Sequence, residues 1–293
     1  ELERAGENSI FLPGFQFPSN LHVVYDMGEA LEGSGLAVMA VPSIHLRSVA
    51  RLIPDRFREG SVWAIATKGL EEGTGMRMSE VLRDLWPEVQ PVTLAGPSLA
   101  REVAAGKPTT VLSASSDATL AEKVRAAFHG PDFRVYTSGD PIGVELGTSL
   151  KNVIALAAGI ADGMELGANA KGALVTRGLA EITRLGVAMN ARRETFLGLA
   201  GVGDLVTTCS SPLSRNRTLG EQIGRGVPVA EAMAGMTQVA EGVPTTRSAV
   251  RLARERGVEM PISEQVHRVL FESLDPRDAL RGLMERPPRM EEE

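Results

Sequence analysis

Lys151 is the residue of this sequence best suited to move a proton. It lies within residues 143–152, and its neighbours Leu150 and Val153 belong to a helical face of small apolar residues. Burial of an amine among apolar groups lowers its pKa from ~10.4 towards values that suit proton transfer. The alternative is an ordinary exposed helix lysine. The sequence alone leaves both interpretations open.

Three polar loops each follow an apolar run that is typical of a buried strand. They are Pro42-Ser43, Lys68-Gly69 and Gly96-Pro97-Ser98. Ligands of open parallel sheets bind at the carboxyl ends of the strands, so we expect these loops to converge on one site. Gly96 permits a close backbone approach, and Ser98 would supply an N-cap hydroxyl beside an anionic or carbonyl oxygen. Taken singly, Lys68 also fits a solvated strand end, and the glycine loop an ordinary capped turn.

A polar, glycine-punctuated segment at residues 201–217 is long for a loop between helices, and such loops often bind ligands. Arg215 and Asn216 are candidates to hold a phosphate, because a guanidinium matches phosphate oxygens with parallel hydrogen bonds. The alternative is structural, with Ser214 and Asp204 acting as helix caps.

The elements that must position these residues change character near residue 140. Before it, short apolar runs alternate with helical patterns, which predicts an open, mostly parallel α/β sheet. Strands are predicted at residues 21–25, 36–41, 62–67, 92–95, 109–113 and 133–137. After it, the apolar spacing is helical throughout. We therefore predict an α/β domain at residues 1–140 and an all-helical domain at residues 141–293.

Composition disfavours several classes of protein. The chain has 31 Lys and Arg against 37 Asp and Glu, a net charge of −6, which does not support a broad nucleic-acid-binding surface. No apolar run approaches the length of a membrane span and residues 1–4 do not resemble a signal peptide, so we expect a soluble cytoplasmic protein. Cys209 is the only cysteine and the four histidines are scattered, so we predict no disulfide and no metal site.

Taken together, these segments resemble the bacterial NAD(P)-dependent glycerol-3-phosphate dehydrogenases over essentially the whole chain. The shared motifs, in the family's order and approximate spacing, are Val41-Pro42-Ser43, Thr67-Lys68-Gly69, Ala95-Gly96-Pro97-Ser98, Leu150-Lys151-Asn152-Val153, Gly203-Asp204-Leu205 and Leu213-Ser214-Arg215-Asn216. The resemblance implies a Rossmann-like domain followed by a helical substrate domain. It also implies a homodimer that uses NAD or NADP to interconvert dihydroxyacetone phosphate and sn-glycerol 3-phosphate for glycerophospholipid synthesis.

The resemblance further implies a role for each site residue. Lys151 would be the general base in oxidation and the proton donor to the ketone in reduction, with Lys68 as a second ammonium group beside the carbonyl. Asn152, Asp204 and Thr208 would orient Lys151 and the reacting hydroxyl. The implied substrate-binding residues are Lys68, Gly96, Ser98, Lys151, Asp204, Ser214, Arg215 and Asn216. The implied cofactor-binding residues are Pro42, Lys68, Ala100, Arg215, Val239 and Glu241.

One departure from the family's pattern concerns the nucleotide. The sequence contains no G-x-G-x-x-G, and neither Gly33-Ser34-Gly35 nor Gly201-Val202-Gly203 completes one. In the family this loop precedes the counterpart of Glu1, so we expect an N-terminally truncated chain without its first β-α-β portion or the residue that distinguishes NAD from NADP. One alternative, a cofactor-deficient remnant without catalysis, follows from this departure. A second alternative is a related two-domain dehydrogenase with another small substrate, against which a phosphate site at Arg215 and Asn216 would argue.

Overall fold

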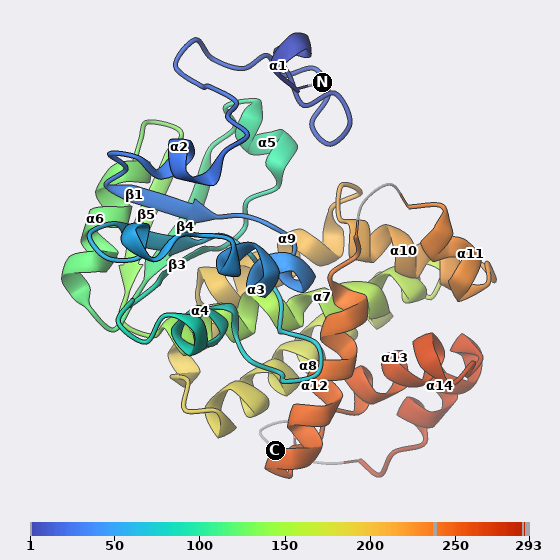
Figure 1. The fold of residues 1–293 in the computed structure, drawn as a ribbon. Coiled ribbons are helices and arrows are strands. Elements are labelled where there is room, and N and C mark those ends of the chain that lie inside the picture. Colours follow the sequence, from blue (N-terminus) through green and yellow to red (C-terminus); the bar gives the residue numbers. More distant parts are fainter. Residues whose placement is uncertain (1, 237–238, 289, 291–293) are drawn as a thin grey trace.

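A five-stranded sheet lies beside a set of packed helices in the computed structural model, which describes residues 2–236, 239–288 and 290 (Figure 1). The strands, in their spatial order, are β1 (Leu36–Met39), β2 (Val62–Ile65), β3 (Val92–Ala95), β4 (Thr109–Ala114) and β5 (Phe133–Ser138). Neighbouring strands are parallel except β3 and β4, which are antiparallel. The predicted α/β class and mostly parallel sheet are confirmed.

Helices cover both faces of the sheet, which explains why its strands read as continuous apolar runs. Successive side chains of β2 point to opposite faces. Trp63 packs in one apolar cluster with residues of α3 (Ser43–Arg51) and α4 (Met78–Leu85), whereas Ala64 packs in another with α6 (Ala118–Phe128). The remaining short helices of this half are α1 (Leu2–Ala5), α2 (Met27–Leu31), the 3-10 helix η1 (Asp55–Phe57) and α5 (Ala100–Ala104).

The strand predicted at residues 21–25 is wrong. These residues have no regular secondary structure, and the side chains of Leu21 and Tyr25 are 46% and 80% exposed. An alternating pattern gives a strand only where another strand offers its backbone groups and a core covers one face. This segment has neither, because it pairs with no strand of the sheet and none of its residues is buried.

Helix α7 (Pro141–Gly163) links the sheet domain to the helical half (Figure 1). It begins where Asp140 accepts a hydrogen bond from Gly143 N at 3.0 Å, with proline at the first turn. Contrary to our expectation that no segment is long and apolar enough to cross a bilayer, α7 meets that condition, with a mean hydropathy of 1.3. Because 94% of its apolar window is buried inside the protein, it is a core helix.

Glycines set the distance between α7 and α10 (Arg215–Gly224). A Cβ on Gly159 would lie 2.0 Å from the Arg217 carbonyl oxygen, and one on Gly220 would lie 2.1 Å from that of Leu156. No side chain fits at these positions, so the two backbones pack directly against each other. This contact fixes the start of α10 relative to Lys151.

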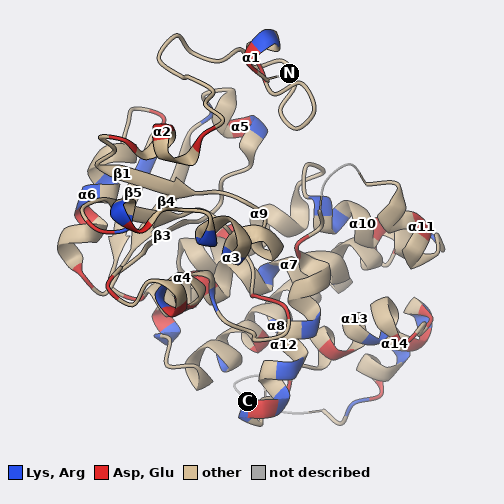
Figure 2. Cartoon of the chain, viewed as in Figure 1, with Lys and Arg blue, Asp and Glu red and all other residues tan. Residues whose placement is uncertain are grey.

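The rest of the second half is also helical, as predicted. Its elements are α8 (Gly167–Ala188), η2 (Arg193–Leu197), η3 (Leu199–Gly203), α9 (Asp204–Ser210), α11 (Val229–Ala234), α12 (Gly242–Arg256), α13 (Pro261–Phe271) and α14 (Pro276–Met284). The loop predicted over residues 201–217 is wrong, because only residues 211–214 lie between helices. Gly201 serves packing, because a Cβ there would lie 1.8 Å from the Phe196 carbonyl oxygen. Acidic and basic residues are interspersed over both halves (Figure 2).

Candidate active site

Two lysines share the carboxylate of Asp204. Lys151 Nζ, from α7, donates to Asp204 Oδ1 and, at 2.7 Å, to Thr208 Oγ1. Lys68 Nζ, from the loop after β2, donates to Asp204 Oδ2 at 3.0 Å and to the Gly96 carbonyl oxygen at 2.8 Å. The structure thus brings together these five residues, which the sequence analysis named from four separate segments.

The environment of Lys151 favours loss of its proton. The residue is 5% exposed, and its pKa is lowered to about 7. Burial is the largest cause of this lowering. The charge of Asp204 opposes it, and the charge of Lys68 adds to it. An amine with this pKa is present in both protonation states near neutral pH, so it can donate a proton or accept one. Of the two interpretations of Lys151, the structure shows the buried one.

Asp204 is not a helix cap, although the sequence allowed this alternative. It is the first residue of α9, is 1% exposed, and directs both carboxylate oxygens to lysines. A buried carboxylate needs such partners, because an unpaired buried charge is costly. Asn152 is also buried, next to Lys151 on α7, but among the described residues no hydrogen bond joins its side chain to Lys151 or Asp204.

Gly96 has the close backbone approach that its loop predicts. Its φ is 147°, and a Cβ there would lie 3.0 Å from the Val111 Cα atom of β4. The predicted capping role of Ser98 is wrong, because Leu99 is the N-cap residue of α5 and Ser98 Oγ instead donates to the Gly96 carbonyl oxygen at 3.1 Å. The same carbonyl accepts from Lys68, so Ser98 helps to hold the loop that anchors the lysine.

The start of α10 presents one exposed and one buried polar side chain. Ser214 is its N-cap residue and accepts from Arg217 N at 3.3 Å, as the structural alternative predicted. Asn216 is buried and its Oδ1 accepts from Gly242 N at 2.9 Å, which ties α10 to the start of α12. Arg215 is exposed. Its guanidinium is therefore available to an anion.

The segments assigned to the cofactor converge from β1, β2 and α12. Ser43, which follows the α3 N-cap residue Pro42, donates its backbone N–H at 3.2 Å and its hydroxyl to the Glu241 carboxylate. A Cβ on Gly69 would lie 2.8 Å from Ser43 Cβ and 3.4 Å from Glu241 Oε2. Glu241 therefore lies where the loops after β1 and β2 meet the helical half.

Arg215 extends this group, because its Nη1 donates to the Val239 carbonyl oxygen at 3.0 Å. A guanidinium and a carboxylate suit the phosphate and ribose hydroxyls of a dinucleotide, so Arg215 and Glu241 fit part of NAD or NADP. Ala100 lies exposed at the start of α5, and no contact of its side chain tests its assignment.

Three buried polar residues next to this site escaped the sequence analysis: Ser79, Glu145 and Ser149. Glu145 and Ser149 lie four positions apart on α7, so they share a helix face. The available signal was a carboxylate and a hydroxyl inside an otherwise apolar helix, where polar groups need partners. Their partners could not be read locally, because they lie in the loop after β2 and at the start of α4.

Cys209 lies next to Thr208 in sequence but is not a candidate nucleophile. It is fully buried, and burial raises the pKa of its thiol to about 12. Within residues 2–236, 239–288 and 290, no group of three or more His, Cys, Asp and Glu side chains could hold a metal ion.

The chain has the architecture of a two-domain dehydrogenase. A Rossmann-like sheet domain is followed by a helical domain, and a buried lysine lies where they meet. The family model described as the N-terminus of NAD-dependent glycerol-3-phosphate dehydrogenase matches residues 1–121, and that of its C-terminus matches residues 140–281. The chain belongs to the NAD-dependent glycerol-3-phosphate dehydrogenase family.

Comparisons with individual relatives support the assignment to this family. The chain is 48% identical to glycerol-3-phosphate dehydrogenase [NAD(P)+] of Syntrophotalea carbinolica, over 99% of this chain and 88% of that protein. It is 48% identical to the enzyme of the same name from Koribacter versatilis, over 97% and 86% of the two chains. The crystal structure of glycerol-3-phosphate dehydrogenase from Coxiella burnetii matches with a TM-score of 0.92 at 41% identity, over 97% of this chain and 87% of that one.

These comparisons do not support the expectation of a missing β-α-β portion, because the family's N-terminal model matches residues 1–121. The sequence still has no G-x-G-x-x-G, but the absence of a motif does not establish truncation. The residues present form a five-stranded sheet with helices on both faces.

Proposed function

We propose that this chain interconverts dihydroxyacetone phosphate and sn-glycerol 3-phosphate with NAD or NADP. The observation that carries the proposal is the buried Lys151 paired with Asp204 and facing Lys68, in a chain of the NAD-dependent glycerol-3-phosphate dehydrogenase family. The relatives from Syntrophotalea carbinolica and Koribacter versatilis carry the name of this activity.

Lys151 is the proton-transfer residue of the proposed reaction. In reduction its ammonium donates a proton to the ketone oxygen, and in oxidation its neutral amine takes the proton from the hydroxyl. Bound NADH or NADPH supplies the hydride that the carbonyl carbon accepts. With a pKa of about 7, Lys151 serves both directions near neutral pH. Lys68 stabilises negative charge that develops on the ketone oxygen.

The other site residues bind and orient the substrate. Asp204 and Thr208 hold the Lys151 amine through the hydrogen bonds described above, and Asn152 lies beside it. Arg215 neutralises the substrate phosphate, because its guanidinium is exposed and charge-assisted hydrogen bonds to phosphate are strong. The remaining substrate-binding residues of this proposal are Gly96, Ser98, Ser214 and Asn216.

The cofactor is assigned to the group around Glu241. Pro42, Lys68, Ala100, Arg215, Val239 and Glu241 border it in this proposal. The contact of Glu241 with Ser43 supports the assignment, because it joins the helical domain to the sheet domain. Within the helical domain, Arg215 contacts Val239, two positions before Glu241. We further propose that residues 1–140 form the dinucleotide-binding domain and residues 141–293 the substrate domain. We also propose that the protein is a cytoplasmic homodimer and that its activity serves glycerophospholipid synthesis.

The proposal is tested by following NADH or NADPH oxidation on addition of dihydroxyacetone phosphate. Unphosphorylated dihydroxyacetone and small keto acids serve as rival substrates. We expect turnover with the phosphorylated ketone and little with the others, because they lack the group that Arg215 neutralises. Absence of turnover with either nucleotide, or equal turnover with dihydroxyacetone, would overturn the proposal.

Lys151→Ala then tests the chemical role. General acid–base catalysis contributes roughly 10²–10⁴-fold, so kcat should fall by that factor while the dissociation constant of the nucleotide stays unchanged. Lys171→Ala is the control, because Lys171 is also bonded to a carboxylate, that of Asp162, but is only partly buried and lies outside the site. An unchanged kcat in Lys151→Ala would refute the assignment of Lys151 as the proton-transfer residue.

A further inference from the structure

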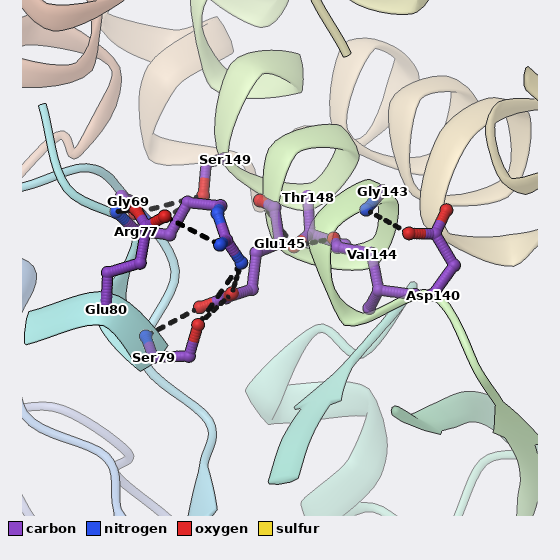
Figure 3. Close-up of polar contacts among 10 residues, drawn as sticks. All are labelled: Gly69, Arg77, Ser79, Glu80, Asp140, Gly143, Val144, Glu145, Thr148 and Ser149. Atoms are coloured by element: carbon purple, nitrogen blue, oxygen red, sulfur yellow. Dashed lines mark hydrogen bonds and ion pairs between the residues drawn. The ribbon is translucent and has the colours of Figure 1, made fainter. Parts of the chain in front are cut away.

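Two side chains of α7 hold the two ends of the segment that joins β2 to α4 (Figure 3). Ser149 contacts Gly69 at the start of this segment, and Glu145 contacts Ser79 at its end. Because both side chains lie on one face of a rigid helix, the segment is fixed at two points relative to Lys151, which follows on the same helix.

At the first point, one hydroxyl bonds both backbone groups of a single residue. Ser149 Oγ accepts from Gly69 N at 2.9 Å and donates to the Gly69 carbonyl oxygen at 3.2 Å. Gly69 has a φ of 138°, a conformation that favours glycine. Ser149 is 1% exposed, so without its hydroxyl these backbone groups would lose a partner that water does not replace.

At the second point, the Glu145 carboxylate binds the start of α4. Oε1 accepts from Ser79 N at 2.9 Å, and Oε2 accepts from Ser79 Oγ at 2.5 Å and Arg77 Nη1 at 2.7 Å. Burial raises the pKa of Glu145, and the charge of Arg77 opposes this effect. Arg77 also pairs with Glu80 at 2.7 Å, so the guanidinium retains a partner of its own.

We propose that Ser149, with Glu145 as the second anchor, is a positioning residue that holds Lys68 opposite Lys151. Gly69 follows Lys68 directly, so the peptide bound by Ser149 is the base from which the Lys68 side chain extends. Asp204 and the Gly96 carbonyl hold its far end. A lysine has a flexible four-carbon stem, so its ammonium is placed reliably only when both ends are fixed. The inference rests on the proposed function, in which Lys68 contacts the substrate.

Displacement of Lys68 would change the pKa of Lys151 as well as the binding of substrate. The charged and titratable groups that interact with the Lys151 amine are Lys68 from the loop after β2 and Asp204 and Cys209 from α9. The charge of Lys68 lowers the pKa of Lys151. When Lys68 moves away, the pKa of Lys151 therefore rises, and the pH at which ketone reduction is half-lost rises with it.

The test compares Ser149→Ala with Thr148→Ala, its neighbour on α7. Thr148 is equally buried, but its hydroxyl bonds only carbonyl oxygens of its own helix, at 2.8 Å to Val144. We expect Ser149→Ala to raise KM for dihydroxyacetone phosphate roughly five- to tenfold, the factor that corresponds to about one neutral hydrogen bond. It should also move the pH midpoint of reduction upwards, whereas Thr148→Ala should change neither.

A second readout does not need turnover. NMR titration of lysines labelled with ¹³C at Cε follows the pKa of Lys151 in the protein without substrate, with Lys151→Ala used to assign its signal. The Lys151 midpoint should rise in Ser149→Ala and, to a smaller extent, in Glu145→Gln, which weakens only the second anchor. Failure of the proposed function would abolish turnover of the unaltered protein but leave this NMR shift in place.

The inference is overturned if the Lys151 midpoint in Ser149→Ala equals that of the unaltered protein, or if Thr148→Ala moves it equally. An increase in KM without a change in either midpoint also overturns it, because that result describes a structural hydroxyl and not one that positions Lys68. Alanine is a good helix former, so we expect both variants to fold, and circular dichroism checks this.

Discussion

Replacement of Asp204 by asparagine removes the negative charge that two lysines share. The side chain keeps its shape and one oxygen, so the main change is electrostatic. The charge of Asp204 raises the pKa of Lys151, which burial and Lys68 lower to about 7. Without this charge the proton is held less tightly. The pKa of Lys151 in Asp204→Asn must therefore lie below that of the unaltered protein.

The size of this fall follows from the geometry. A pair of charges at ~4 Å is worth about 4 kcal/mol at an effective dielectric constant of about 20, and one pKa unit corresponds to about 1.4 kcal/mol. Lys68 competes for the same carboxylate at 3.0 Å, which reduces the part that Lys151 receives. We therefore expect the pH midpoint of ketone reduction to fall by at least about one unit.

The assay measures kcat/KM for dihydroxyacetone phosphate reduction, and for glycerol phosphate oxidation, across the pH range in which the protein is folded. Reduction requires the protonated amine, so its falling limb moves to lower pH in Asp204→Asn. Oxidation requires the neutral amine, so its rising limb moves in the same direction. Asp162→Asn is the matched control, because Asp162 also bridges two cations, Lys171 and Arg217, but lies outside the site.

The reasoning is refuted if the midpoints of Asp204→Asn stay in place or move to higher pH. The first result would mean that Lys151 does not feel this carboxylate in solution. The second would mean that the substitution opens the site to water, which returns the amine towards its usual pKa. A shift of similar size in Asp162→Asn would show that the effect is not specific to the lysine pair.

Two further predictions concern the phosphate and the packing of α7. Arg215→Ala should raise KM for dihydroxyacetone phosphate roughly 10- to 150-fold, because a hydrogen bond to a charged group is worth about 1.5–3 kcal/mol. The control is Arg225→Ala, which should leave KM unchanged, because Arg225 lies at the other end of α10 and pairs with Glu221. If KM is the same in Arg215→Ala and Arg225→Ala, Arg215 does not bind the substrate phosphate. Gly159→Ala should lower the free energy of unfolding by about 1–3 kcal/mol because its Cβ overlaps α10, whereas Gly172→Ala, with open space on α8, should raise it by roughly 0.5–1 kcal/mol in denaturant titrations. A stabilised Gly159→Ala would contradict the close contact.

Much of the fold could be predicted from the sequence, because local patterns and local caps agree with it. The predicted strand at residues 92–95 has the observed bounds, Val92–Ala95. Helix α6 begins where its cap and pattern require: Asp117 accepts from the backbone N–H groups of Thr119 and Leu120. In such segments the short-range chemistry and the tertiary packing favour the same structure.

The wrong loop at residues 201–217 arose because one residue type, glycine, serves two purposes. The glycines of residues 201–203 are typical of a flexible loop, yet at Gly201 the absence of a side chain allows η3 to pack tightly against Phe196. The contacts of Ser149 with Gly69 and of Glu145 with Ser79 span 80 and 66 positions, so no local pattern could reveal them. The convergence of Lys68, Lys151 and Asp204 was expected only through the family resemblance.

The two perturbations of the lysine pair have opposite signs, and this difference separates electrostatics from disorder. Any substitution that merely loosens the site admits water and raises the pKa of Lys151 from about 7 towards its usual value. Loosening can therefore imitate the effect predicted for Ser149→Ala, but it cannot produce the fall predicted for Asp204→Asn. A fall in Asp204→Asn would establish that charges set this pKa. A rise in Ser149→Ala, absent from Thr148→Ala, would then follow from the position of Lys68.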